Sequence, residues 1–368
     1  MLDTYLDYNA TAPLRDGVRR AMIDAMGPPA NPSSVHGYGQ RARLMVEDAR
    51  ASIARRVGSM PEEIIFTSGG TEANAMALRQ PCSAMAISGI EHAAVLESAP
   101  SAHHLPVDAA GVVDLTALDD WLGQQPRGAG VAIMAANNET GVIQPMAESA
   151  GITARHGAWL HCDAVQGLGK MPLDFSTMGV SSLALSGHKI GGPTGVGALV
   201  LKEGMPAHPL SRGGGQEKNR RPGTENLIGI IGFGVAAMLA DPDVFEAHCR
   251  PLQQQLEHRL GVEAPDAVIF GQAARRLANT TSIAMPGRLA ETQVMALDLA
   301  GVAISAGAAC SSGKVRSSHV LEAMGAGDLA ASAIRISSGW DTTSNDIDRL
   351  AEAWLRLYKQ GSSFNPID

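Results

Sequence analysis

Cysteine is scarce in this sequence. The 368 residues contain four cysteines, and no two of them form a CxxC pair. Their wide spacing excludes the common zinc motifs and a disulfide framework. For Cys82, Cys162 and Cys249 we expect buried positions, because free cysteine behaves as a small hydrophobe. Cys310 differs from them because serine, glycine and alanine surround it.

The sequence also lacks a basic region and a long apolar run. Lys and Arg total 29 against 37 Asp and Glu, which gives a net charge of −8. Arg19 with Arg20 and Arg220 with Arg221 are runs too short for a nucleic-acid patch. No stretch has the apolar length of a membrane span, and residues 1–5 have no signal-peptide pattern. We therefore expect no nucleic-acid partner, no membrane partner and a cytoplasmic location.

What is present is the composition of a globular enzyme of two domains. Hydrophobic residues make up 45% and charged residues 18% of the chain. Between Glu62 and Leu201, short apolar runs end in glycine-rich or polar turns, as at 64–66, 131–134 and 159–162. Helical patterns often follow these turns. The alternation predicts an α/β fold with a mostly parallel sheet covered by helices, and ligands bind beyond the carboxyl ends of such strands.

The second half of the chain has a different pattern. Beyond a composition change near residues 261–265, short strands and helices are mixed, which predicts a smaller α+β domain. The expected helices cover 226–239, a segment after Asp241 and Pro242, 291–300 and 345–358, and the expected strands cover 268–270, 281–284 and 302–304. We find no internal repeat.

A lysine lies at one of the strand ends. Lys189 closes Ser186-Gly187-His188-Lys189, after the apolar run 183–185 and before a glycine pair. An amine that loses its proton near neutral pH can form an imine with a carbonyl group. By itself the motif is weak, since most loop lysines are solvated charges.

Asp163 ends an earlier strand and provides the context for Lys189. A carboxylate there can pair with a protonated pyridine nitrogen and so help the ring to withdraw electrons. Gln166, three residues later, and Asn138 can hydrogen-bond a phenolic oxygen on such a ring. A glycine-rich turn at 68–74 that leads into a helix can hold a phosphate through its backbone N–H groups. Together these features favour a pyridoxal-phosphate site.

With these motifs in their order, the sequence resembles the cysteine desulfurases of the NifS/IscS type, within the class V aminotransferase group. The resemblance covers nearly the whole chain, and its motifs lie at 5–11, 31–37, 67–74, 91–92, 137–139, 163–166, 186–189, 213–217, 221–226, 308–312 and 335–337. It implies a fold type I PLP-dependent transferase with pyridoxal 5'-phosphate as cofactor. We expect a large cofactor-binding domain over 12–255 and a small domain over 1–11 and 256–368 that carries the Cys310 loop.

The resemblance also implies roles for individual residues. Lys189 is similar to the lysine that forms the imine and moves the α-proton, Asp163 to the partner of the pyridinium nitrogen, and His92 to the histidine that stacks on the ring. Arg335 and Asn138 resemble the substrate-binding residues. The other implied cofactor contacts are Asn138 and Gln166 at the phenolic oxygen and Gly70, Thr71, Ser186, His188 and Thr224 at the phosphate, with Thr224 reaching in from the second subunit of a homodimer.

Cys310 lies in a run of small residues that predicts a mobile loop. In the family this thiolate takes sulfur from L-cysteine, leaves a persulfide, releases alanine and passes the sulfur to an acceptor such as an iron–sulfur scaffold protein. A transient iron–sulfur ligand role is a second candidate for Cys310. The other reactions considered are selenocysteine lyase, cysteine-sulfinate desulfinase and transamination, and Cys310 argues against the last. An inactive scaffold would lack Lys189, Asp163 or Cys310, and all three are present.

Overall fold

The computed structural model describes residues 4–27, 29–307 and 317–362, with side chains to residue 360. Within these residues, a seven-stranded sheet has the order β2-β8-β7-β6-β5-β3-β4. Only β8 runs antiparallel to its neighbours, so the prediction of a mostly parallel sheet is confirmed. The strands are β2 (Ile64–Thr67), β3 (Met85–Ser88), β4 (His103–Leu105), β5 (Gly130–Ala132), β6 (Trp159–Asp163), β7 (Ser182–Ser186) and β8 (Gly197–Leu201).

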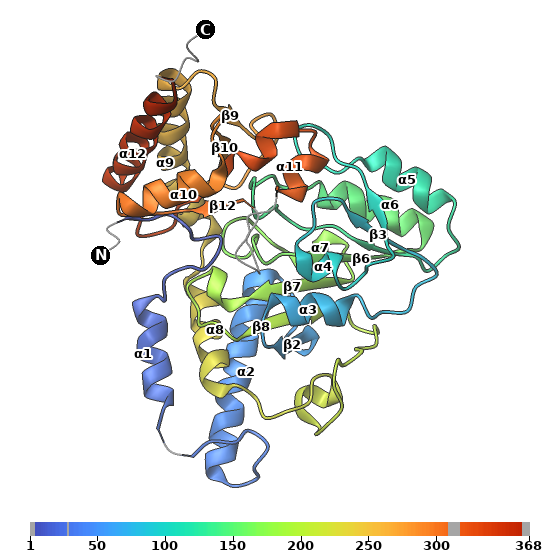
Figure 1. Ribbon diagram of the computed structural model, residues 1–368. Coiled ribbons are helices and arrows are strands. Elements are labelled where there is room, and N and C mark those ends of the chain that lie inside the picture. The colour runs from blue at the N-terminus through green and yellow to red at the C-terminus, as the bar shows by residue number, and fades with distance from the viewer. Residues whose placement is uncertain (1–3, 28, 308–316, 363–368) are drawn as a thin grey trace.

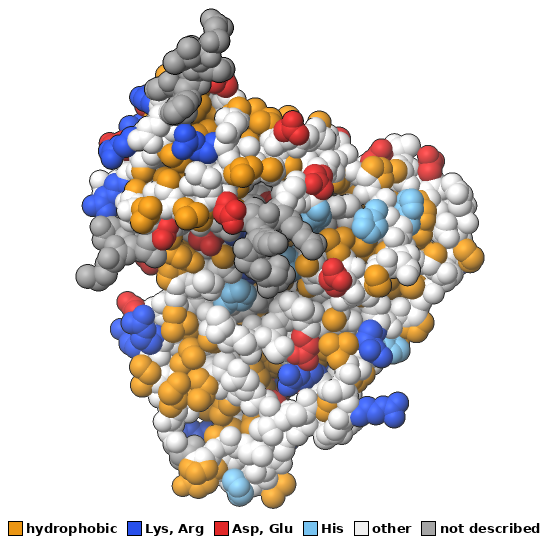
Figure 2. Space-filling view, in the orientation of Figure 1, with side chains coloured by type: hydrophobic (Ala, Val, Ile, Leu, Met, Phe, Trp, Pro, Cys, Tyr) orange, Lys and Arg blue, Asp and Glu red, His pale blue; other side chains and the backbone are white. Residues whose placement is uncertain are grey.

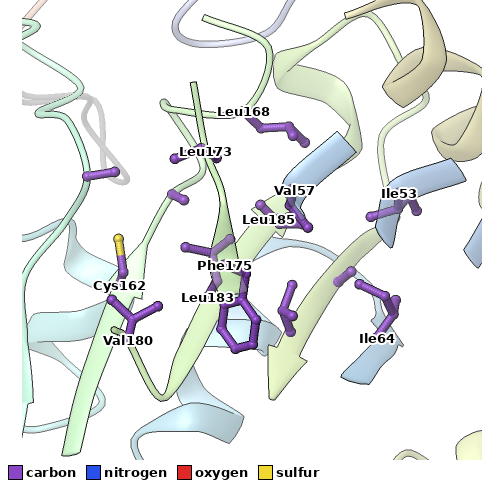
Figure 3. Close-up of a cluster of buried hydrophobic side chains, with 14 of the residues drawn as sticks. Ile53, Val57, Ile64, Cys162, Leu168, Leu173, Phe175, Val180, Leu183 and Leu185 are labelled. Carbon is purple, nitrogen blue, oxygen red and sulfur yellow. The ribbon is translucent and has the colours of Figure 1, made fainter. Parts of the chain in front are cut away.

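Helices cover the sheet because its strands are apolar on both faces. Ile64 and Leu185 belong to an apolar cluster that includes α2 and α8, whereas Ile65 and Ala184 pack with α3. Figure 1 shows α2 and α8 side by side, and Figure 3 shows the buried side chains between α2 and the strands. These helices are α1 (Asp16–Ala25), α2 (Gly37–Val57), η1 (Pro61–Glu63), α3 (Gly70–Ala77), α4 (Ala93–Leu96), α5 (Leu115–Gly123), α6 (Met146–His156), α7 (Phe175–Met178), η2 (Gly187–Lys189), η3 (Gln216–Asn219) and α8 (Leu227–Leu239).

A second, antiparallel sheet has the strand order β12-β13-β10-β9, and the N-terminal β1 joins β11 beside it. Its apolar cluster includes side chains of α9, α10 and α12 and also Leu6 from the start of the chain. Helices α9, α10 and α12 lie at the upper left of Figure 1. The elements around this sheet are β1 (Thr4–Tyr5), α9 (Pro242–Glu263), β9 (Val268–Ile269), β10 (Thr280–Ala284), α10 (Ala290–Leu299), β11 (Val302–Ala303), β12 (Ser305–Ala306), α11 (His319–Ala323), η4 (Gly327–Ala331), β13 (Ala333–Ser337) and α12 (Ser344–Ser362).

The ends of two predicted helices have clear local causes. The Asp241 carboxylate accepts hydrogen bonds from the N–H groups of Asp243 and Val244, with Pro242 in the first turn of α9. Before α12, Thr343 and Asp346 exchange backbone-to-side-chain hydrogen bonds, which is a reciprocal helix cap. Both helices therefore begin at the turns that the sequence predicts.

The cysteine prediction is right at two described positions and wrong at one. Cys162 and Cys249 are free and buried, and Cys162 lies among apolar side chains in Figure 3. Cys82 is exposed, because it follows Pro81 in the loop between α3 and β3 and not in a strand or helix. Among the described helices, none is by itself long and apolar enough to span a membrane; α8 and α9 pass that test only as a pair bent by 70°.

Candidate active site

A cavity of about 350 Å³ opens at the carboxyl ends of the central strands. This volume lies within the range of small-molecule sites. The turns after β2, β5, β6 and β7 contribute its lining, and β13 adds one arginine. The predicted site residues that line it are Gly70, Thr71, His92, Asn138, Asp163, Gln166, Ser186, His188, Lys189 and Arg335.

Lys189 lies in η2, directly after β7, and lines the cavity. Its Nζ donates to the carbonyl oxygens of Asn9 and Ala10, each at 2.7 Å. Desolvation by burial, followed by the charge of Arg335, lowers the pKa of the amine from 10.5 to about 8. A lysine of this kind supplies a neutral amine near physiological pH.

Asp163 is held by a buried chain of hydrogen bonds. Its Oδ2 accepts from Asn74 Nδ2 at 2.7 Å, and its Oδ1 accepts from the Val165 N–H at 2.9 Å. The Asn74 Oδ1 then faces His161 Nε2 at 2.8 Å, so this ring nitrogen must carry the hydrogen. Burial lowers the pKa of His161 to about 3, which keeps the ring neutral. Both carboxylate oxygens are therefore fixed, although burial raises the pKa of Asp163.

His92 forms another part of the wall. Its Nδ1 accepts from the Ala94 N–H at 3.1 Å and caps α4, which sets the orientation of the ring. The ring is open to solvent through the cavity, yet desolvation by its surroundings lowers its pKa, with Lys189 adding to the effect and Asp163 opposing it. A neutral ring with a fixed orientation can stack on a planar ligand.

An anion cradle lies at the start of α3. Gly69 provides no side-chain cap there, so the first N–H groups of the helix are available to a ligand beside Thr71. A Cβ at Gly70 would stand only 2.6 Å from Val165 Cγ2, which explains why glycine is required. Across from it, His188 bonds Thr11 Oγ1 at 3.2 Å, and desolvation lowers its pKa to about 4.

Arg335 completes the cavity from β13. Its Nη2 donates to Asp7 Oδ1 at 2.7 Å, and its Nη1 donates to the Asn138 carbonyl at 3.2 Å. The Nε group is buried and has no hydrogen-bond partner among the described residues. A buried guanidinium with a free donor is suited to hold a carboxylate.

Comparison with known proteins identifies the family. The family model described as aminotransferase class-V matches residues 4–350. A cysteine desulfurase of Cereibacter sphaeroides is 40% identical, with 98% of this chain and 97% of the relative covered. The solved structure of a NifS-like protein from Rickettsia africae is 36% identical, with a TM-score of 0.91 and coverage of 97% and 99%. The chain belongs to the cysteine desulfurases of the class-V aminotransferase family. A further solved structure, SspA in complex with cysteine, is 28% identical over 91% of this chain and 98% of that one, with a TM-score of 0.77.

One predicted site residue that the structure describes is not in the cavity of this cysteine desulfurase chain. Thr224 lies on an exposed segment and does not line the cavity. Cys310 lies outside the described residues.

The motifs also gave no role to a second buried lysine. Lys170 Nζ donates to Asn9 Oδ1 and Gln166 Oε1, both at 2.7 Å, and desolvation lowers its pKa well below the ordinary value. The Gln166 Nε2 donates one hydrogen to the Asn9 carbonyl at 3.0 Å, which leaves its second hydrogen for a ligand. The four-residue spacing of Gln166 and Lys170 is the sequence signal that could have revealed this pair.

His161 has a comparable signal. It precedes Asp163 by two residues on β6, so the two side chains share one face of the sheet. The contact with Asn74 joins them through a residue of α3. A buried histidine on the face of a functional aspartate is therefore a candidate for holding that aspartate in place.

Proposed function

We propose that this cysteine desulfurase converts L-cysteine to L-alanine and leaves the sulfur as a persulfide on Cys310, with Lys189 as the amine that runs the proton chemistry. The observation that supports this most strongly is Lys189 itself: an amine of lowered pKa in one cavity with a fixed carboxylate, Asp163, and an arginine with a free donor, Arg335. This combination suits an amino-acid substrate bound to a carbonyl cofactor.

The cavity residues fit pyridoxal 5'-phosphate. Gly70, Thr71, Ser186 and His188 would hold the phosphate, Asp163 would pair with the pyridine nitrogen, and the Gln166 and Asn138 side chains would serve the phenolic oxygen. Glycine at position 70 supports the cradle, because a Cβ there would stand only 2.6 Å from Val165 Cγ2. When bound, the cofactor supplies a conjugated electron sink for charge at the substrate α-carbon.

The protein's residues then have separate tasks. Arg335 binds the substrate carboxylate, and Lys189 takes and returns the proton at the α-carbon. His92 covers one face of the cavity. The Cys310 thiolate attacks the substrate sulfur, so that an S–S bond forms and the Cβ–S bond breaks. The electron pair of that bond stays with the carbon skeleton, which takes up a proton and leaves as alanine, so no outside oxidant or reductant is needed.

L-Cysteine is the substrate that the relatives support. One solved relative is described as a complex with cysteine, and the matched curated relative is named a cysteine desulfurase. Selenocysteine and cysteine sulfinate remain comparison substrates for the assay. The sulfur acceptor that we propose is a protein such as an iron–sulfur scaffold.

We place the active form as a homodimer in the cytoplasm, with Thr224 of each subunit completing the phosphate site of the other. Exposed apolar side chains of α1 and α8 support an interface: Ile23, Met26, Met238 and Leu239. Figure 2 shows apolar side chains gathered at the lower left of the molecule. We also propose the division into a unit of residues 12–255 and a unit of 1–11 and 256–368, because Leu6 packs in the apolar cluster of α9, α10 and α12.

Two variants test the assignment. Borohydride reduction of the cofactor-loaded protein should attach the cofactor to Lys189, and mapping to another lysine would contradict the proposal. In a single turnover with cysteine, Cys310→Ala should still change the visible spectrum but release no alanine, whereas Lys189→Ala should fail before that spectral change. Normal alanine release from Cys310→Ala would overturn the role of Cys310.

A further inference from the structure

The turn at residues 137–140 holds Glu139 in a fixed position beside the cavity. The Asn137 Oδ1 accepts hydrogen bonds from the N–H groups of Glu139 and Thr140, at 2.9 and 3.0 Å. Its Nδ2 donates to the Ile90 carbonyl at 3.0 Å. Glu139 is only 3% exposed, so its carboxylate is directed inward from a rigid turn.

The Glu139 carboxylate contacts both flanks of the segment that carries Cys310. Ser318 Oγ donates to Glu139 Oε2 at 2.6 Å, a distance typical of an O–H···O⁻ bond. On the other flank, a Cβ built on Gly307 would stand 2.7 Å from the same oxygen and 4.0 Å from Ser318 Cβ. Gly307 and Ser318 therefore lie next to each other beside the Glu139 carboxylate, to which Ser318 donates and against which Gly307 packs closely.

Each flank is also tied to another wall of the cavity. Before Gly307, β12 pairs with β13, with Ser305 opposite Arg335. After Ser318, the His319 Nε2–H donates to the Glu91 carbonyl at 3.0 Å, next to His92. Both ends of the segment thus contact parts of the chain that contribute lining residues, β13 with Arg335 and the turn with His92.

We propose that Glu139 is a positioning residue that holds the two ends of the Cys310 segment together at the cavity. The inference rests on the proposed function, in which Cys310 receives sulfur. Cys310 follows Gly307 by three residues, which limits the distance between their Cα atoms to about 11 Å. Keeping both ends at one carboxylate raises the effective concentration of the thiol at the cavity.

Glu139, which we call the anchor of the segment, should affect the rate of sulfur transfer and leave the rates of the earlier steps unchanged. In Glu139→Ala we expect persulfide formation in a single turnover to slow about tenfold or more, the order expected when a charge-assisted hydrogen bond that fixes a reactive segment is lost. The rate of the spectral change on adding cysteine should stay within about twofold, because Glu139 does not line the cavity. Glu139→Gln should be intermediate, since its amide oxygen can still accept from Ser318.

Ser318 needs a control because it also caps α11, where its Oγ accepts from the Leu321 N–H. Ser318→Asp keeps a good capping residue but places a second carboxylate beside Glu139. We expect it to slow persulfide formation as much as Ser318→Ala, whereas a role in helix capping alone would leave it close to the wild type. The exposed neighbour Ser317 gives the matched control, Ser317→Ala, which should not change the rate.

A second measurement needs no cofactor. In the cofactor-free protein, alkylation of Cys310 is compared with that of Cys82, which is exposed and serves as the internal reference. Glu139→Ala and Ser318→Asp should both change the ratio of the two rates, and Ser317→Ala should not. Unchanged ratios together with unchanged persulfide rates would overturn the anchor, as would an equal slowing of the spectral change. Failure of the proposed function would be seen separately, as alanine release by Cys310→Ala.

Discussion

Lys189 gives the most direct quantitative prediction. Desolvation and then the charge of Arg335 lower the pKa of its amine from 10.5 to about 8. At pH 7.5 roughly one amine in four is then neutral, against about one in a thousand for an unperturbed lysine. Because only the neutral amine is nucleophilic, Lys189 should hold about two hundredfold more of the reactive form than a lysine of ordinary pKa, and it should react faster with an electrophile.

Trace labelling of the cofactor-free protein with acetic anhydride measures this rate directly. The labelled lysines are mapped by mass spectrometry over a series of pH values, and the exposed Lys202 serves as the reference amine. The labelling of Lys189 should rise to a midpoint near pH 8. Arg335→Gln should move that midpoint to higher pH, because a positive charge that lowers the pKa of Lys189 is lost. A midpoint at the ordinary value for lysine would refute the reasoning.

Three further predictions concern a buried ion pair, the anion cradle and the network behind Asp163. Arg50→Met should lower the free energy of unfolding by about 3–5 kcal/mol in urea titrations, because Glu217, bonded to Arg50 at 2.7 Å, would stay buried without its partner. Restoring stability with a paired Glu217→Met change would support this. Gly70→Val should weaken pyridoxal-phosphate binding about tenfold or more in a spectroscopic titration, because the added side chain clashes with the Val165 side chain. His161→Leu should cost about 1–3 kcal/mol of stability and also weaken that binding, since Asn74 loses the group that orients it; unchanged cofactor affinity would contradict the role of the network.

The sequence predicted much of the cavity because its residues occur in short contiguous motifs at strand ends. Asp163 ends β6 and Lys189 follows β7, and parallel neighbouring strands bring their carboxyl ends together. The helix and strand positions in the second half agree with the structure to within a few residues at most ends. Helix α12 continues to Ser362, beyond the expected end at 358, and α10 is shifted by one residue. Strand β10 begins one residue before its expected start, and β11 ends one residue before its expected end.

Other features could not be predicted because they depend on contacts between distant segments. Asn9 meets Lys170 and Lys189 through side-chain and backbone oxygens, although the three lie far apart in the sequence. The expected strand at 131–134 ends instead at Ala132, because the Met134 N–H donates to the Glu91 carboxylate and not to a neighbouring strand. No local sequence pattern predicts that a distant carboxylate will accept this N–H.

Glu139 illustrates the same limit. It lies inside the Asn137-Asn138-Glu139 motif, yet the motif gives no sign that its carboxylate meets Gly307 and Ser318. The prediction for Cys82 is wrong for a local reason. Its residue type favours burial, but it follows Pro81 in an exposed loop. Residue type sets a tendency, and the local chain path decides the outcome.

The central claim is that Lys189 runs the proton chemistry while Cys310 receives the sulfur. The most direct test mixes the cofactor-loaded protein with cysteine in the absence of reductant, and then locates the added sulfur by peptide mass spectrometry. We predict about one persulfide per subunit, on the Cys310 peptide, with an equal amount of alanine released. Sulfur on Cys82, Cys162 or Cys249, or sulfide release with no protein-bound sulfur at all, would contradict the account.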